Sequence, residues 1–107
     1  MDFAWDPEKH EQNLDKHGVD FIDAIEVLSN PHHAPEVDYA GAERRHIAVG
    51  PLPPETIPPE WSGPLCAVLY TMRDEGRTCR IISARRAREN ERKGYRTHVG
   101  RGGSTSS

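Results

Sequence analysis

The fold is decided by residues 65–83, LCAVLYTMRDEGRTCRIIS. Residues 65–71 form a continuous apolar run of strand length, which is typical of a central strand. Residues 74–77 (DEGR) have the composition of a tight turn, and residues 78–83 then return as an antiparallel strand. This stretch predicts two adjacent strands in the middle of an antiparallel sheet.

Two more strands are expected before this hairpin. Residues 36–39 and 44–49 have strand-like patterns, and residues 40–41 (AG) predict the turn between them. Residues 51–64 contain six of the nine prolines. Because proline removes ladder donors and fixes an extended geometry, we expect a stiff surface loop there.

The N-terminal part of the chain predicts two helices. Residues 6–8 (DPE) form a helix start, in which an N-cap acceptor precedes proline at the first helical position. This helix should end near His17, because Gly18 can take the left-handed conformation that follows a helix. Asp20 can cap a second helix, which residues 30–31 (NP) should end. Its expected core-facing stripe consists of Phe21, Ala24, Ile25 and Leu28.

A last helix is expected to open near Ser83 and to run through Lys93. The residues after it are rich in glycine and serine and have little apolar content. We therefore expect one domain over residues 1–96, followed by a disordered tail over 97–107. The predicted fold class is α+β, with two N-terminal helices, a four-stranded antiparallel sheet and a C-terminal helix.

The composition restricts the class of protein. A chain of 107 residues has room for one hydrophobic core. Only 35% of the residues are hydrophobic, and no apolar run approaches the roughly 20 residues that a membrane span requires. The acidic first ten residues do not resemble a secretory signal. These features predict a cytoplasmic protein without a membrane partner, in which Cys66 and Cys79 are buried and reduced.

The net charge of −3 hides a strong asymmetry between the two halves of the chain. Residues 1–60 carry four basic and thirteen acidic side chains, a balance of −9, whereas residues 61–107 carry ten basic and four acidic ones, a balance of +6. A basic half on an acidic protein indicates one face that binds a polyanion. The alternative is a solvated surface on which the two halves form salt bridges with each other.

Three sequence blocks resemble one known family, the BrnT ribonuclease toxins. The first block is Trp5-Asp6-Pro7 with Lys9, Asn13, Lys16-His17-Gly18-Val19 and Phe21; the second is Glu43-Arg44-Arg45; the third is Arg80-Ile81-Ile82-Ser83-Ala84-Arg85-Arg86-Ala87 with Glu91-Arg92 and Tyr95. The resemblance covers roughly residues 3–96. The Pro-rich stretch at 51–64 departs from it, because it is longer than the short hairpin expected there.

The resemblance implies a RelE-like fold and cleavage of RNA, either with or without the ribosome. It also implies a partner, a BrnA-like antitoxin that neutralises the toxin and binds operator DNA, so that this chain reaches DNA only through the antitoxin. The acidic N-terminal half argues against direct DNA contact by this chain alone.

Metal-free cleavage of RNA needs a base for the 2′-hydroxyl proton, cations for the charge that develops on the phosphate, and an acid for the leaving oxygen. Arginine suits the second task, because its planar guanidinium stays charged and matches phosphate oxygens. The candidates are Arg73, Arg80 and Arg85. Arg85 is the foremost of them, because we expect it in the first turn of the last helix, where anions bind.

The candidates for base and acid are His17, Lys16 and Tyr95. His17 titrates near neutrality, and Lys16 would do so if it were desolvated. Both also suit the C-terminal end of a helix electrostatically, and Tyr95 could equally stack on a base or cover the core. The candidate RNA-backbone contacts are Lys9, Arg44, Arg86 and Arg92.

No metal or other cofactor is expected, because the histidines and cysteines lack the close spacing of a zinc site. The leading hypothesis is an endoribonuclease toxin that cleaves mRNA and inhibits translation. Two alternatives remain open. One is a non-catalytic module that binds RNA or the ribosome, and the other is a co-regulator that acts only in complex with a DNA-binding antitoxin.

Overall fold

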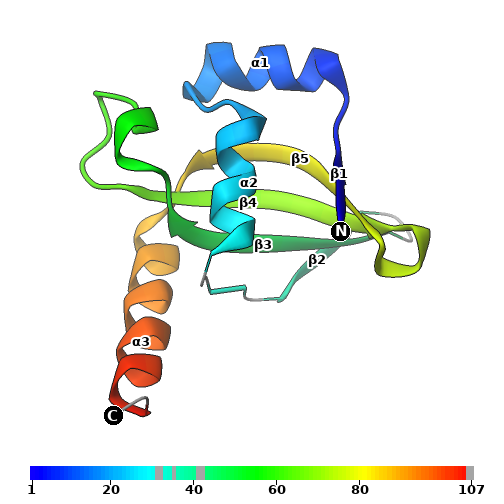
Figure 1. Ribbon diagram of the computed structural model, residues 1–107. Helices are drawn as coiled ribbons and strands as arrows, with labels where there is room; N and C mark the ends of the chain where they lie inside the picture. The colour runs from blue at the N-terminus through cyan, green and yellow to red at the C-terminus, as the bar shows by residue number, and fades with distance from the viewer. Residues whose placement is uncertain (31–32, 35, 41–42, 106–107) are drawn as a thin grey trace.

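A mixed β-sheet of five strands forms the centre of the computed structural model, which describes residues 1–30, 33–34, 36–40 and 43–105 (Figure 1). The strand order is β1-β5-β4-β3-β2. The strands are β1 (Asp2–Ala4), β2 (Glu36–Ala40), β3 (Glu43–Pro51), β4 (Leu65–Arg73) and β5 (Thr78–Arg86). The described part of the chain also holds three α-helices, α1 (Pro7–His17), α2 (Phe21–Ser29) and α3 (Glu89–Thr105). The predicted α+β class is therefore confirmed.

The prediction of a four-stranded antiparallel sheet was wrong, because the sheet is mixed. The additional strand, β1, pairs in parallel with the start of β5, from Asp2 opposite Thr78 to Ala4 opposite Arg80. It is only three residues long, which is too short to show an alternating pattern in the sequence. Its place at the sheet edge is fixed by the backbone of β5.

The central hairpin forms as predicted. Strands β4 and β5 pair antiparallel from Arg73 opposite Thr78 to Cys66 opposite Arg86, and the chain turns through a short 3-10 helix at Asp74–Gly76. The register shifts where Leu69 faces Ser83 but Tyr70 faces Ile81, so that Ile82 is an extra residue in β5. This β-bulge bends β5 beside α1.

The last helix begins later than predicted. Strand β5 continues past Ser83 to Arg86, because its backbone keeps pairing with β4, and α3 opens only at Glu89. The Glu91 carboxylate accepts the backbone N–H of Arg88 at 2.7 Å, as in one half of a capping box. The prediction that Arg85 lies inside the helix was therefore wrong, and Arg85 is a strand residue.

The two N-terminal helices begin and end as predicted. The Asp6 carboxylate accepts the N–H of Glu8 at 2.9 Å, and Gly18 ends α1 with a φ of 73°. Asp20 caps α2 by accepting the N–H of Ile22 at 2.8 Å. Helix α2 ends at Ser29 with Asn30 as its C-cap. The predicted stop at Pro31 and the predicted turn at Gly41 lie outside the described residues.

The main core lies between the sheet and α2, which crosses one face of the sheet (Figure 1). Phe21, Ala24 and Val27 of α2 are buried there with Val68 and Ile81 of the sheet. Trp5 packs against the same core, with its ring edge-on to Phe21 at 6.0 Å between centroids. Trp5 is therefore an anchor of the core at the start of α1.

The Pro-rich loop contributes to this core, which differs from the prediction of a surface loop. Leu52 is buried, and Ile57 and Trp61 pack against the core from the loop side. A Cβ atom added at Gly18 would lie 3.4 Å from the Pro58 ring. The loop therefore also packs against the end of α1. The loop thus covers one end of the core instead of forming an edge of the sheet.

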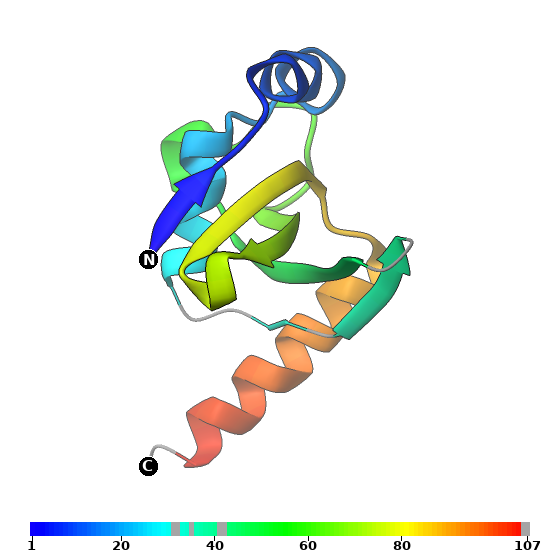
Figure 2. The same ribbon diagram turned by 90° about the vertical axis from the view of Figure 1, so that its right-hand side faces the viewer.

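A second, smaller core lies where α3 meets the opposite face of the sheet. Val49, Ala67 and Ala87 are buried there, and Tyr95 of α3 packs against them. The distal part of α3 extends away from the sheet (Figure 2). Whereas the composition suggested a disordered tail from residue 97, α3 continues to Thr105, and residues 106–107 lie outside the described part.

Cys66 and Cys79 are buried in β4 and β5 as free thiols, which agrees with the prediction for both. Over the described ranges, no helix combines the length and the apolar character needed to cross a bilayer.

Candidate functional site

Four basic side chains surround a hollow of about 120 Å³ on the face of the sheet opposite α2. We call it the arginine hollow, and its lining residues are Lys9, Glu43, Arg45, Thr71, Arg73, Arg80, Ile81 and Ile82. Three neighbouring strands supply its floor. Thr71 of β4 lies opposite Arg80 of β5, and β3 runs antiparallel on the other side of β4, so that Arg45 comes level with Thr71. Residues that face each other across strands point to the same side of a sheet, which brings the cations together.

The arginine hollow is electropositive. It holds four cationic side chains and one carboxylate, a formal balance of +3. That carboxylate, Glu43, accepts a hydrogen bond from the Arg73 guanidinium at 2.6 Å. Arg45 has a buried Nε atom without a hydrogen-bond partner among the described residues. Because buried donors are normally paired, an unpaired guanidinium N–H in an electropositive hollow favours an anionic ligand.

A second hollow, of about 280 Å³, adjoins the first between α1 and β5. We call it the lysine hollow; it is lined by Lys9, Gln12, Asn13, Lys16, His17, Ile82 and Ser83. The two hollows share Lys9 and Ile82. None of the described residues that line the lysine hollow is acidic. Together the two hollows form a cationic surface that continues from the β4–β5 turn to the end of α1.

His17 is the one residue of this surface whose ordinary pKa lies near neutrality. Burial lowers the pKa of its imidazole, and the nearby positive charges of Lys16 and Arg85 lower it further. The neutral form of His17 therefore dominates at neutral pH. A neutral imidazole is the form that can accept a proton.

Asn13 holds α1, and with it the lysine hollow, against β5. Its carboxamide accepts the Ala84 N–H at 3.0 Å and donates to the Ala84 carbonyl and the Val19 carbonyl, both at 2.9 Å. The side chain is 5% exposed. Sequence reasoning assigned no role to Asn13; an asparagine in the interior of a helix, where its side chain competes with the backbone for hydrogen bonds, is the signal that could have marked it.

Arg85 does not line either hollow, although it was the foremost catalytic candidate. Its guanidinium makes a bidentate pair with the Glu91 carboxylate, at 2.7 and 2.9 Å, and also donates to the Arg86 carbonyl. The two side chains are only 16% and 9% exposed. Burial acts to raise the pKa of the Glu91 carboxyl, but hydrogen bonds from Arg85 and the Arg88 N–H outweigh it and lower the pKa. Arg85 thus joins β5 to the start of α3.

The other sequence candidates also lie outside the two hollows. Tyr95 packs on the second core, and Arg92 donates to the Ala87 carbonyl behind the start of α3. Arg86 donates to the carbonyl and the hydroxyl of Ser62 in the Pro-rich loop. Arg44 precedes Arg45 in β3, so strand alternation turns it to the other face of the sheet. Of the sequence candidates, the structure brings together Lys9, Lys16, His17, Arg73 and Arg80.

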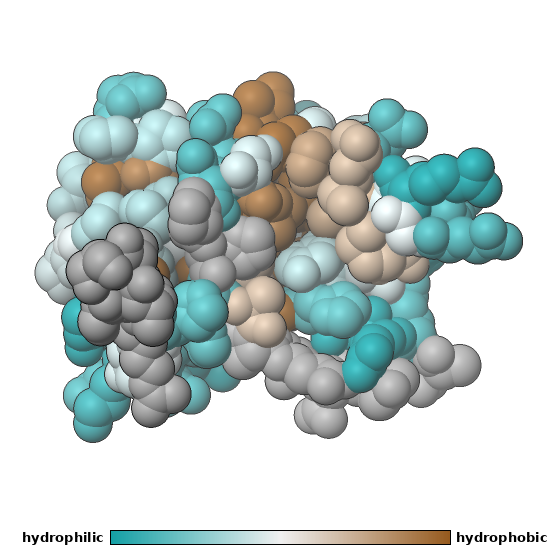
Figure 3. All heavy atoms as spheres, turned by 60° about the horizontal axis from the view of Figure 1, so that its bottom comes forward, coloured by the Kyte–Doolittle hydropathy of each residue, from teal (hydrophilic) through white to brown (hydrophobic). Residues whose placement is uncertain are grey.

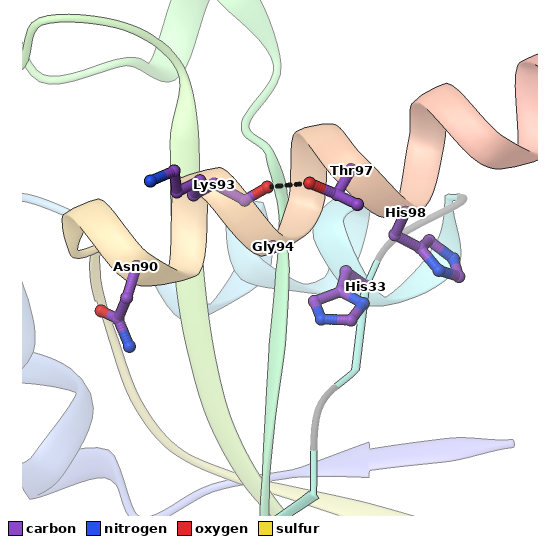
Figure 4. Close-up of a pocket in the computed structure, with 6 residues that line it drawn as sticks. All are labelled: His33, Asn90, Lys93, Gly94, Thr97 and His98. Atoms are coloured by element: carbon purple, nitrogen blue, oxygen red, sulfur yellow. Dashed lines mark hydrogen bonds between the residues drawn. The ribbon is translucent and has the colours of Figure 1, made fainter.

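Two further hollows differ in chemistry from this cationic surface. One of about 440 Å³ lies beside α3, where the rings of His33 and His98 are 5.0 Å apart and Lys93 is the nearby cation (Figure 4). The other, of about 160 Å³, is lined by residues without an acidic or basic side chain: Met1, Phe3, Leu28, Tyr70, Met72 and Cys79. Apolar side chains reach the surface in the middle of the face shown in Figure 3. Neither hollow offers the clustered guanidinium groups that a polyanion requires.

No three or more His, Cys, Asp or Glu side chains within the described part of the chain are grouped so that they could hold a metal ion. The ionisable side chains that line the two hollows are those of arginine, lysine, His17 and Glu43.

The comparisons with known proteins give a family for the chain. No curated protein matches the sequence. The chain is similar to the crystal structure of the Brucella abortus ribonuclease toxin BrnT, with 26% sequence identity and a TM-score of 0.59, over 83% of this chain and 99% of that one. The family model described as "Ribonuclease toxin, BrnT, of type II toxin-antitoxin system" matches residues 5–91. This match covers most of the chain, including α1, the whole hairpin and the start of α3, and the protein therefore belongs to the BrnT family of ribonuclease toxins.

Proposed function

We propose that this protein is an endoribonuclease toxin that cleaves mRNA across the two adjoining hollows, without a metal ion, and thereby inhibits translation in the cytoplasm. One observation carries the proposal. In a member of a ribonuclease toxin family, Lys9, Arg73, Arg80 and the neutral His17 gather on one continuous surface. The cations suit the phosphate, and the imidazole suits proton transfer.

The proposed reaction is an internal transesterification. His17 takes the proton of the 2′-hydroxyl, the 2′-oxygen attacks the adjacent phosphorus, and the 5′-oxygen leaves with a proton from an acid. Arg80 and Lys9 stabilise the extra negative charge on the phosphate, because both are cations that line the arginine hollow. Lys16, beside His17, is the candidate acid. The products are a 2′,3′-cyclic phosphate and a 5′-hydroxyl.

The type II system to which the family belongs implies an antitoxin partner. We propose a BrnA-like antitoxin that covers the cationic surface and carries the contact with operator DNA. We further propose that the fold is RelE-like in the arrangement of its sheet and helices. In this proposal Arg85 and Tyr95 support the position of α3 and do not touch RNA.

The decisive experiment is digestion of a single-stranded RNA by the purified protein with a chelator present. We expect cleavage products that end in a 2′,3′-cyclic phosphate, and no cleavage when the 2′-hydroxyls are methylated. His17→Ala and Arg80→Ala should each reduce the rate about 100-fold or more. Arg96→Ala, an exposed cation on α3, is the matched control and should leave the rate unchanged.

Binding without cleavage would overturn the enzymatic proposal. It would favour a module that sequesters RNA or the ribosome, and a parallel reaction with ribosomes added distinguishes a ribosome-dependent enzyme from such a module. If the protein neither binds nor cleaves RNA, and acts only with the antitoxin on DNA, the co-regulator hypothesis stands instead.

A further inference from the structure

The arginine hollow contains one cation and one anion that take no part in the proposed reaction. They are Arg45 and Glu43, which lie two residues apart on β3 and therefore point to the same face of the sheet. The third member of the group is Arg73, which Glu43 holds at 2.6 Å.

Arg45 and Arg80 are the two partly buried cations of the hollow. The Nε of Arg45 is buried and lacks a hydrogen-bond partner among the described residues, whereas the Arg73 side chain is 50% exposed. The hydroxyl of the neighbouring Thr71 donates to the Arg44 carbonyl at 3.0 Å and does not accept a hydrogen bond from the Arg45 Nε. A guanidinium with a buried, unused N–H gains most from a ligand that brings an anionic oxygen.

Glu43 is the only acidic group among the described residues that line the hollow. It occupies a guanidinium edge of Arg73, which is the same group that a phosphate oxygen would use. A ligand that binds between Arg45 and Arg73 must therefore displace Glu43 or accept its repulsion. The carboxylate is 36% exposed, so it can rotate toward solvent when it is displaced.

We infer that Arg45 anchors an RNA phosphate in the arginine hollow and that Glu43 is a built-in competitor of that phosphate for Arg73. This inference rests on the proposed function and adds two residues to it. Arg45 fixes the position of the backbone, and Glu43 limits the affinity of the free toxin for RNA. Both act on binding, so they can be tested without cleavage.

The test is the binding of a short fluorescein-labelled, single-stranded 2′-O-methyl RNA, followed by fluorescence anisotropy at several salt concentrations. Arg45→Ala should weaken binding about tenfold and reduce the slope of log affinity against log salt by about 0.7, the loss of one phosphate contact. Arg45→Lys keeps the charge but lacks the Nε donor, so it should keep the slope and lose part of the affinity. Glu43→Gln should strengthen binding about three- to tenfold.

Two controls separate the specific effect of Arg45 on RNA binding from effects of the substitutions on folding and on net charge. If Arg45→Ala lowers the melting temperature, Arg45→Gln takes its place, because glutamine retains much of the packing of the arginine stem. Arg96→Ala changes the net charge equally at an exposed site on α3 and should leave both affinity and slope close to those of the parent.

The outcomes separate this inference from the proposed function. If Arg80→Ala weakens binding but Arg45→Ala and Arg45→Gln do not, the RNA surface stands and the anchoring role of Arg45 is wrong. If Glu43→Gln binds no better than the parent, the competition is wrong. If the parent protein does not bind the RNA at all, the proposed function fails as well.

Discussion

The carboxamide of Asn13 pairs with both backbone groups of Ala84, accepting its N–H at 3.0 Å and donating to its carbonyl at 2.9 Å. Strand β1 accompanies β5 only as far as Arg80, so the outer edge of β5 lacks a strand partner at Ala84 among the described residues. The Asn13 side chain takes the place of that partner. One buried amide therefore connects α1, with its lysines and His17, to the middle of β5.

Asn13→Asp should destabilise the fold strongly although it barely changes the size of the side chain. The carboxylate can still accept the Ala84 N–H, but it cannot donate to the two carbonyls, and it is a buried charge. We expect the free energy of unfolding to fall by about 2–4 kcal/mol in urea denaturation. Gln12→Glu makes the same chemical change at an exposed neighbour in α1 and should cost less than about 0.5 kcal/mol. Equal stabilities of the two variants would contradict this account.

Arg85→Ala should lower stability, because it leaves the Glu91 carboxylate buried without its bidentate partner. Breaking such a pair costs about 3 kcal/mol, which corresponds to roughly 10 °C or more in melting temperature for a chain of this size. Arg80→Ala is the matched control in the same strand and should leave the melting temperature nearly unchanged while it weakens RNA binding.

A double variant distinguishes the two roles of Arg85. Arg85→Met with Glu91→Leu replaces the buried ion pair by apolar side chains and should recover part of the lost stability, although Glu91→Leu also removes the acceptor of the Arg88 N–H. If Arg85 only positions α3, RNA cleavage should recover with it. If stability returns but cleavage does not, Arg85 acts on the RNA as the sequence analysis expected.

The helices could be predicted because their ends are fixed by local signals. Asp6 and Asp20 accept N–H groups only two residues away, and Gly18 adopts its left-handed conformation at the end of its own helix. The end of β5 has no such local signal. Arg86 continues the strand because Cys66, twenty residues earlier in the chain, lies opposite it. A helix start near Ser83 was therefore a reasonable prediction from local sequence, and a wrong one.

The part of the candidate site that the β4–β5 hairpin positions could be predicted from the sequence. Arg73 and Arg80 flank one turn, and antiparallel pairing alone brings them near each other. Arg45 could not be distinguished from Arg44 in this way, because the choice between two adjacent residues depends on which face of β3 meets the core. The burial of Val49 with α3 places Arg45, four residues earlier, on the face of the arginine hollow.

The pKa of His17 should lie below the ordinary value of 6.5 when it is measured by NMR titration of the imidazole. Burial contributes most to this shift, and the Lys16 and Arg85 charges add to it. Lys16→Gln removes one positive neighbour and should raise the pKa, whereas Lys93→Gln on α3 should not change it. Because the unfolded chain holds the proton more tightly, His17 should reduce stability as the pH falls from about 6.5 through the folded pKa. If His17 is the base, the acid limb of cleavage by the parent protein should follow the same pKa.

The two thiols should resist modification until the protein unfolds. Burial raises the pKa of Cys66 to about 12 and that of Cys79 to about 11, and the side chains are 0% and 2% exposed. The reactive thiolate is therefore both scarce and inaccessible. In a colorimetric thiol assay we expect slow labelling of the native protein, with a rate set by opening of the sheet, and rapid labelling of two thiols in denaturing urea. Asn13→Asp should accelerate the native reaction, because it weakens the attachment of α1 along β5, the strand that contains Cys79. Rapid labelling of either thiol in the native parent would show that β4 or β5 is less well packed than the core described above requires.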